Sequence, residues 1–217
     1  YNMNYRDFIQ KIIYYLINPL IRGMIKVGIT PNIVTFIGFL GNMAAAGMFI
    51  YAATLTGGRY AWIGYGGWVL IASSLFDMMD GRLARLGNMS STFGAFWDST
   101  LDRYSELVSL GGIVGFYFGL EGKTWGLDNT VWGILTLAAM IGSVMVSYVR
   151  ARAEGLGLDC KVGIMQRPER VVVLCLGAIV AGFIDNGIPV CVAILIIAVL
   201  SNITAFWRIA HVYKQLK

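Results

Sequence analysis

The chain has 217 residues, of which 57% are hydrophobic and only 13% are charged, and its mean hydropathy is +0.68. A water-soluble domain of this length could not bury so much apolar surface, so the composition excludes an ordinary soluble globular protein. The net charge of +5 would fit a nucleic-acid-binding protein, but the basic residues are distributed as in a membrane protein. We therefore expect membrane lipids, and no nucleic acid, among the partners.

Residues 1–30 precede the first long apolar run and show an amphipathic pattern. Apolar side chains gather near one face of a predicted helix and basic ones supply its polar side: Phe8, Ile12, Ile13, Tyr15 and Leu16, with Arg6, Lys11, Arg22 and Lys26. Such a helix lies on a membrane rather than crossing it. Thr30 and Pro31 fit the cap and first turn of the next helix. No removable signal peptide is expected, and Met3 is a plausible native start.

Six apolar segments follow, and each is long enough to cross a hydrocarbon layer as a helix or nearly so. They run over residues 32–55, 61–80, 93–119, 130–149, 170–184 and 187–207. The predicted fold class is an all-α membrane protein, with six transmembrane helices preceded by an N-terminal amphipathic interfacial helix. The predicted division is a juxtamembrane helix over 1–30 and one transmembrane domain over 31–217.

The 17 lysines and arginines divide unevenly between the two sides of this arrangement. Arg59 and Lys123 fall on one side, and the other 15 fall on the opposite side. Because basic residues accumulate on the cytoplasmic side, we expect a multi-pass protein of the cell membrane with both termini in the cytoplasm. The ends of the second and fourth segments and the starts of the third and fifth lie on that side too.

Four carboxylates flank the link between the second and third segments. Asp77 and Asp80 are three residues apart and Asp98 and Asp102 are four apart, so each pair shares one helical face. The short link over 85–91 brings the two helices back antiparallel, and the pairs can converge. Oxygen-only ligands without histidine or cysteine suit a hard cation such as Mg²⁺ or Mn²⁺. The structural alternative is a salt-bridge cluster in which arginines 82, 85 and 103 neutralise the aspartates.

The complete spacing is Asp77-x2-Asp80-Gly81-x2-Ala84-Arg85-x8-Gly94-x3-Asp98-x3-Asp102. It resembles, at all eight positions, the signature of the CDP-alcohol phosphotransferase family. The resemblance covers the whole chain, with six spans, an amphipathic N-terminal helix and the motif running from span two into span three. It implies a membrane enzyme of phospholipid synthesis that moves a phosphatidyl group from a CDP-linked lipid to an alcohol and releases CMP. It also implies a homodimer.

The same resemblance implies roles for individual residues. Asp77, Asp80 and Asp98 correspond to metal ligands that hold the diphosphate, and Asp102 corresponds to the general base, which also touches a second Mg²⁺ or Mn²⁺ ion. The CDP-lipid site would comprise Pro31, Asn32, Thr35, Asp80, Gly81, Ala84, Arg85 and Ser91, with Thr92 as an alternative to Ser91. The small residues let a bulky ligand approach the backbone, and Arg85 offers a fork-shaped donor to a phosphate.

The acceptor is indicated by a rim of basic residues at the predicted cytoplasmic ends of the fourth, fifth and sixth segments. We call it the basic rim, and it suits an alcohol that carries its own phosphate. The stretches "SYVRARAE" (147–154) and "RPER" (167–170), with "DSTLDR" around Asp102, resemble phosphatidylinositol phosphate synthases of bacteria and their archaetidyl counterparts. On that resemblance, inositol phosphate would be bound by Ser147, Arg150, Arg170 and Arg208, with Arg152 and Arg167 close by. For any one of these arginines, ordinary cytoplasmic charge bias is an equally good explanation.

Two other functions fit parts of the sequence. Phosphatidylglycerophosphate synthases use glycerol 3-phosphate, but they usually carry a lysine where this chain has Arg103. A non-enzymatic divalent-cation carrier would need polar residues deep within several spans, and the first, fifth and sixth segments have few. The three cysteines show no metal-ligand spacing; Cys175 and Cys191 are expected to pack in apolar runs, and Cys160 lies in a loop where it could be exposed.

Overall fold

The computed structural model describes residues 17–217, so most of the predicted N-terminal amphipathic helix lies outside the described residues. Residues 17–27 are helical, and six long helices follow: α2 (Pro31–Ala53), α3 (Arg59–Leu86), α4 (Thr92–Phe118), α5 (Asn129–Glu154), α6 (Arg167–Ile184) and α7 (Ile188–Leu216). Two short antiparallel strands, β1 (Lys123–Thr124) and β2 (Leu127–Asp128), join α4 to α5. The prediction of an all-α fold is confirmed.

Each predicted apolar segment corresponds to one helix, but only three helices in the described part of the chain are long and apolar enough to cross a membrane by composition. These are α2, α5 and α7. The other three carry charged residues near their ends, such as Asp77 and Asp80 on α3 and Asp102 on α4, and these lower the hydropathy. The count of six spans therefore stays a prediction.

Several helix starts are set by local chemistry. Pro31 occupies the first turn of α2 and Thr30 is its N-cap residue, as the sequence predicts, although the Thr30 side chain makes no capping hydrogen bond. The α3–α4 link turns at Asn88, whose φ of 52° is left-handed. Ser91 then caps α4 by accepting a hydrogen bond from the backbone N–H of Gly94 at 2.9 Å. The chain thus reverses direction between α3 and α4, and α2 packs against both of them.

Small residues allow close approaches between helices. A Cβ added at Gly112 would lie 2.6 Å from the Cα of Ala46, so α4 and α2 pack backbone against backbone. The large buried side chains, such as Phe49, Phe116 and Trp132, form the core. All three cysteines are free and buried. Cys160 is fully buried, not exposed, because the loop that carries it folds against Arg208 of α7.

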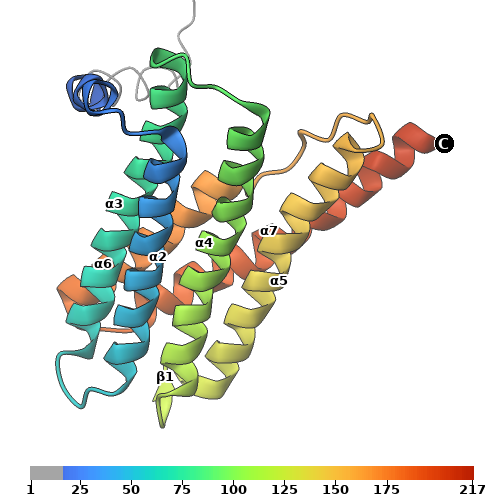
Figure 1. Cartoon of the computed structure of the whole chain (residues 1–217). Coiled ribbons are helices and arrows are strands. Elements are labelled where there is room, and N and C mark those ends of the chain that lie inside the picture. Colours follow the sequence, from blue (N-terminus) through green and yellow to red (C-terminus); the bar gives the residue numbers. More distant parts are fainter. Residues whose placement is uncertain (1–16) are drawn as a thin grey trace, which may run out of the picture.

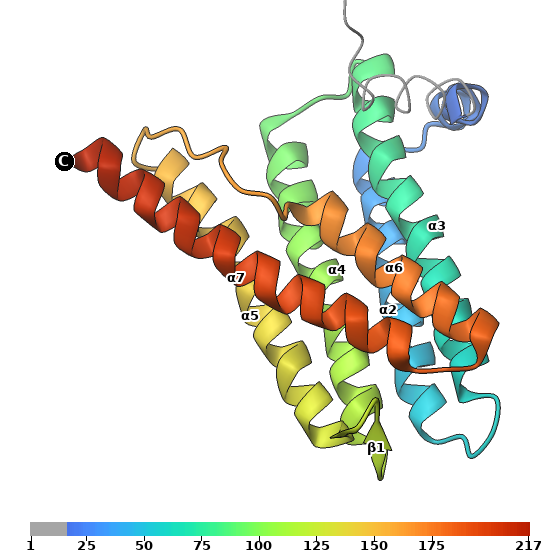
Figure 2. The same cartoon turned by 180° about the vertical axis from the view of Figure 1, so that it is seen from behind.

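Figures 1 and 2 show the two ends of the bundle. The α3–α4 link, the α5–α6 loop and the C-terminus lie at the same end, together with the helix over 17–27, which runs across the direction of α2 to α4. Arg59, at the start of α3, and Lys123, in β1, lie at the opposite end. The helices therefore place the basic residues and the four aspartates as the sequence predicts relative to one another.

Candidate active site

The four aspartates form one acidic cluster between α3 and α4. Asp80 is buried, and the side chains of Asp77 and Asp102 are 14% and 16% exposed. The negative charges of Asp77 and Asp98 act on both Asp80 and Asp102. The antiparallel turn between the helices thus brings together the two carboxylate pairs, as their spacing predicts.

The guanidinium of Arg167 lies within this cluster. Its Nη2 donates to Asp77 Oδ2 at 2.7 Å, and its Nη1 lies 2.8 Å from Asp102 Oδ1. The arginine that contacts both Asp77 and Asp102 is therefore on α6, and the salt-bridge alternative from the sequence does not include it. Of the three arginines that this alternative names, Arg103 also forms an ion pair with Asp102, at 3.7 Å.

The donor chemistry of the cluster fits a hard divalent cation, because it consists of carboxylate oxygens only. Within residues 17–217 no three acidic, histidine or cysteine side chains converge tightly enough to form a ready-made coordination shell. A positive charge nevertheless occupies the position between Asp77 and Asp102, since Arg167 contacts both. The acidic cluster thus attracts a cation, and the assignment of individual metal ligands stays a prediction.

A pocket opens beside the acidic cluster, and we call it the α2–α4 pocket. It is lined by Pro31, Asn32, Thr35, Asp80, Gly81, Ala84, Arg85, Met89, Ser90, Ser91, Gly94, Ala95 and Asp98. All eight residues predicted for the CDP-lipid site are among them. Among the described residues, the lining comes from the first turn of α2, the last turns of α3, the link and the start of α4, and none of it comes from α5, α6 or α7.

Two contacts shape this pocket. The Thr35 hydroxyl donates to Asp80 Oδ2 at 2.6 Å, which joins α2 to the acidic cluster and orients a buried carboxylate. At Gly81, an added Cβ would meet only the tip of the Arg85 side chain, at 3.7 Å. Glycine at this position therefore keeps open the space between the helix backbone and Arg85.

The residues predicted for the acceptor divide into three groups. Arg170 and Arg208 are each 2% exposed; Arg170 forms a bidentate ion pair with Glu106, and Arg208 donates to the carbonyls of Val146 and Val162 at 2.5 and 2.8 Å. Arg150, which is paired with Glu154 at 2.8 Å, lies within electrostatic reach of Arg208. Ser147 is half-buried and Arg152 is exposed on α5, whereas Arg167 lies at the aspartates. Their roles in binding stay predictions.

Sequence reasoning missed Glu106 and the polar pair of Asn42 and Ser109. Ser109 donates to Asn42 Oδ1 at 2.9 Å, and both line, with Glu106 and Arg167, a cavity between the helices. A signal was present, because Glu106 is a carboxylate four residues after Asp102 within an apolar segment, where an unpaired charge is costly.

Comparisons with known proteins all indicate the same family. A family model described as CDP-alcohol phosphatidyltransferase matches residues 28–207. The archaetidylinositol phosphate synthase of Methanothermobacter thermautotrophicus is 34% identical over 205 residues, which cover 92% of this chain and 93% of that protein. The phosphatidylinositol phosphate synthase of Mycobacteroides abscessus is 34% identical over 191 residues, which cover 88% of this chain and 80% of that protein.

Solved structures agree. The phosphatidylinositol phosphate synthase of Mycobacterium tuberculosis with CDP-DAG bound has a TM-score of 0.75 and 31% identity, over 90% of this chain and 92% of that one. The same enzyme in complex with manganese and citrate also has a TM-score of 0.75, over 90% of this chain and 88% of that one. Apolar helices, the complete aspartate motif and these matches lead to one conclusion: the chain is a membrane transferase that belongs to the CDP-alcohol phosphatidyltransferase family.

Proposed function

We propose that this transferase moves a phosphatidyl or archaetidyl group from a CDP-linked lipid to inositol 1-phosphate and releases CMP. The observation that carries the proposal is the α2–α4 pocket, which opens beside four carboxylates and contains every residue predicted to bind the nucleotide. Relatives that match nearly the whole chain are phosphatidylinositol phosphate and archaetidylinositol phosphate synthases, and this supports the choice of acceptor over glycerol 3-phosphate.

In the proposed reaction, a hydroxyl oxygen of the acceptor attacks the phosphorus that carries the lipid. A new P–O bond forms, the bond from that phosphorus to the bridging oxygen of CMP breaks, and CMP leaves with the bond electrons. Asp102 takes the hydroxyl proton, for which it must lie within hydrogen-bond reach of the acceptor. Divalent metal ions, of which we propose two, supply the positive charge that lets an oxygen nucleophile approach an anionic diphosphate when they are bound.

The chain's own residues bind and orient the two substrates. Asp77, Asp80 and Asp98 would hold the metal ions near the diphosphate, and we place the cytidine in the α2–α4 pocket. Arg85 lines this pocket, so its guanidinium can contact a phosphate oxygen.

The acceptor would bind on the opposite side of Asp102, toward α5, α6 and α7. Arg150 and Arg170 both lie within electrostatic reach of Arg208, and this concentration of positive charge suits a phosphate group. Arg167 connects this side to the reacting atoms, because it contacts Asp102 directly. Ser147 and Arg152 complete the proposed set from the end of α5.

An apolar groove between α3 and α6 suits the lipid part of the donor. Its walls are Ile71, Leu75, Met78, Pro168, Val171, Val172, Cys175 and Leu176, and it ends at Asp77 and Arg167. A hydrocarbon chain lying in this groove would bring its linked phosphate to the acidic cluster. The groove therefore fits a lipid-linked donor better than a water-soluble one.

We also propose that the domain over 31–217 forms six spans, that residues 1–30 lie on the membrane surface, and that the protein works as a homodimer. The active site and both termini would face the cytoplasm. The helix over 17–27, which runs across the bundle at the end that carries the aspartates, supports the interfacial placement (Figure 1). The charge asymmetry between the two ends of the bundle supports the orientation.

Release of CMP by the purified protein in detergent tests this function. CDP-diacylglycerol and Mg²⁺ or Mn²⁺ are supplied, and inositol 1-phosphate, glycerol 3-phosphate, free inositol and serine are offered separately. We expect release with inositol 1-phosphate only. Release with glycerol 3-phosphate only would keep the family reaction and refute the acceptor, and the Asp102→Asn variant supplies the background rate.

A further inference from the structure

We propose that Glu106 is a positioning residue for the acceptor half of the site: by binding Arg170, it sets the first turn of α6 and thereby the place of Arg167 beside the acidic cluster. This inference rests on the proposed function, because it assigns Glu106 a part in the transfer reaction. Glu106 contacts neither the α2–α4 pocket nor the aspartates through a bond of its own, and it acts through Arg170.

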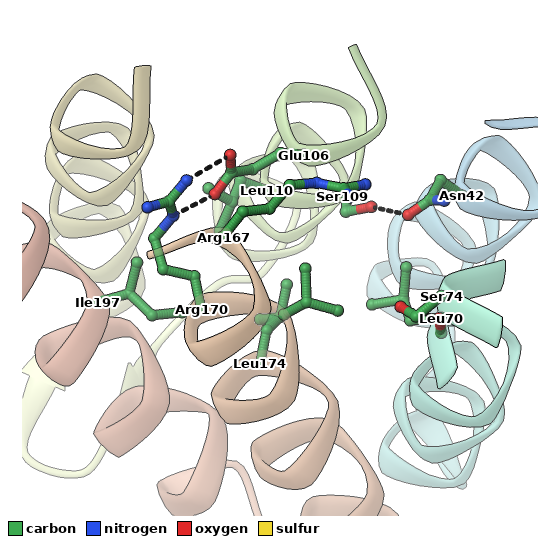
Figure 3. Close-up of a pocket in the computed structure, with 11 residues that line it drawn as sticks. Asn42, Leu70, Ser74, Glu106, Ser109, Leu110, Arg167, Arg170, Leu174 and Ile197 are labelled. Atoms are coloured by element: carbon green, nitrogen blue, oxygen red, sulfur yellow. Dashed lines mark hydrogen bonds and ion pairs between the residues drawn. The ribbon is translucent and has the colours of Figure 1, made fainter. Parts of the chain in front are cut away.

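Two ion pairs connect α4 to α6, and we call them the outer and the inner rung. Asp102 and Glu106 are four residues apart on α4, and Arg167 and Arg170 are three apart on the first turn of α6, so each pair shares a helical face. The outer rung joins Arg167 to Asp102 at 2.8 Å. The inner rung joins both Nε and Nη2 of Arg170 to the two carboxylate oxygens of Glu106 (Figure 3).

The inner rung is rigid and buried. The side chains of Arg170 and Glu106 are 2% and 8% exposed, and a bidentate guanidinium–carboxylate pair fixes both distance and orientation. The remaining side of the Arg170 guanidinium donates from Nη1 to the carbonyl of Met165 at 2.9 Å. The backbone N–H of Met165 in turn donates to Thr204 Oγ1 at 3.2 Å. Glu106 thus ties α4 to the end of the α5–α6 loop and, through it, to α7.

Direct packing between helix backbones does not join the first turn of α6 to α4. The backbone of α6 packs on α3 and α7 and hardly approaches α4. A cavity lies between α4 and α6, lined by Glu106, Arg167, Arg170, Ser109 and Asn42 with several apolar side chains. Figure 3 shows the two arginines extending from α6 across this space toward α4. The long side chains are therefore the direct connection between the first turn of α6 and α4.

The consequence is selective, because the nucleotide and the acceptor bind to different elements. The α2–α4 pocket has no lining residue from α6, so a shift of α6 leaves the nucleotide side intact, whereas the proposed lipid groove is partly lined by α6 and moves with it. The acceptor side contains Arg167 and Arg170 themselves. A change at Glu106 should therefore alter the KM for the acceptor and spare the binding of CDP, which has the nucleotide but no lipid.

Two variants test this. Glu106→Asp keeps the charge but shortens the side chain by one methylene, which draws Arg170 about 1.5 Å toward α4, and Glu106→Gln removes the charge. In both, we expect the acceptor KM to rise about tenfold or more, since misplacements of about 1 Å can cost up to 100-fold, while the dissociation constant for CDP, measured by calorimetry, stays within about twofold. Asp159→Asn, which breaks an exposed ion pair with Lys161, is the matched control and should change neither value.

A role in folding alone gives a different result. Loss of folded protein lowers the maximal rate without changing the acceptor KM or the CDP dissociation constant, so an unchanged acceptor KM in folded Glu106→Asp would overturn the proposal, as would an equal rise in both values. If the wild-type protein transfers to no acceptor, the proposed function fails, and titration of the metal-free protein with Mn²⁺ decides the role of Glu106. Both variants should then bind Mn²⁺ severalfold more tightly, because a loosened Arg167 competes less for Asp77 and Asp102; unchanged binding would overturn the inference.

Discussion

Replacing Arg167 with glutamine removes the guanidinium that contacts Asp77 and Asp102 at 2.7 and 2.8 Å. The Arg167 side chain is 21% exposed and the two carboxylates are 14% and 16% exposed, so this ion pair lies between the buried and the surface cases. Breaking a buried pair costs about 3–5 kcal/mol, and breaking an exposed one costs about 0–1 kcal/mol. We therefore expect the metal-free Arg167→Gln protein to lose about 2 kcal/mol of stability.

The same free energy appears in metal binding. A divalent cation that enters the acidic cluster must displace Arg167 from the two aspartates, and in the variant it has nothing to displace. Since about 1.4 kcal/mol corresponds to a tenfold change in an equilibrium constant, Mn²⁺ should bind Arg167→Gln about ten- to thirtyfold more tightly than the wild type. Saturating Mn²⁺ should therefore remove most of the loss of stability.

Electron paramagnetic resonance of free Mn²⁺ gives the dissociation constant, and thermal unfolding in detergent with EDTA or with Mn²⁺ gives the stability. Arg103→Gln is the matched control, because Arg103 lies 3.7 Å from Asp102 and its side chain is 40% exposed, so its loss should change little. Equal Mn²⁺ affinities of the wild type and Arg167→Gln would refute the reasoning, and so would a loss of stability that Mn²⁺ does not reduce.

Three other perturbations have defined outcomes. Asp102→Asn should abolish CMP release while leaving CDP-lipid binding, measured by calorimetry, largely intact; full activity would end its assignment as the base. Gly81→Leu should raise the KM for the CDP-linked lipid at least about tenfold by filling the α2–α4 pocket, whereas Gly111→Leu, at a site with no neighbour within 4 Å, should not. Gly112→Ala should lower the free energy of unfolding by about 1–3 kcal/mol relative to Gly111→Ala, because its Cβ would lie 2.6 Å from the Cα of Ala46; equal stabilities would contradict this packing.

Hydrophobic periodicity and the aspartate spacing predict much of this architecture. Each apolar segment corresponds to one helix, and the eight residues predicted to bind the CDP-linked lipid line one pocket. The apolar segment predicted from hydropathy ends at residue 80, however, whereas α3 continues to Leu86. The last turns of α3 carry Gly81, Ala84 and Arg85, so the part of the helix that lines the α2–α4 pocket is also its least apolar part.

Long-range ion pairs are not predictable from the sequence in the same way. Arg167 and Asp77 are 90 residues apart, and Arg170 and Glu106 are 64 apart, and helical periodicity relates only residues within one element. The basic rim was predicted as one set, but the structure sends Arg167 to the aspartates and Arg170 to Glu106. Two-residue strands such as β1 and β2 are too short for an alternating pattern, so the hairpin was missed as well.

The acceptor is the central claim, and a competition measures it most directly. Inositol 1-phosphate and glycerol 3-phosphate are offered together, at equal concentration, to the purified protein with Mn²⁺ and CDP-diacylglycerol or its archaeal ether-lipid counterpart. Mass spectrometry of the lipid product then reads the head group. The proposed function predicts a lipid that carries inositol phosphate, and a product that carries glycerol phosphate would contradict it.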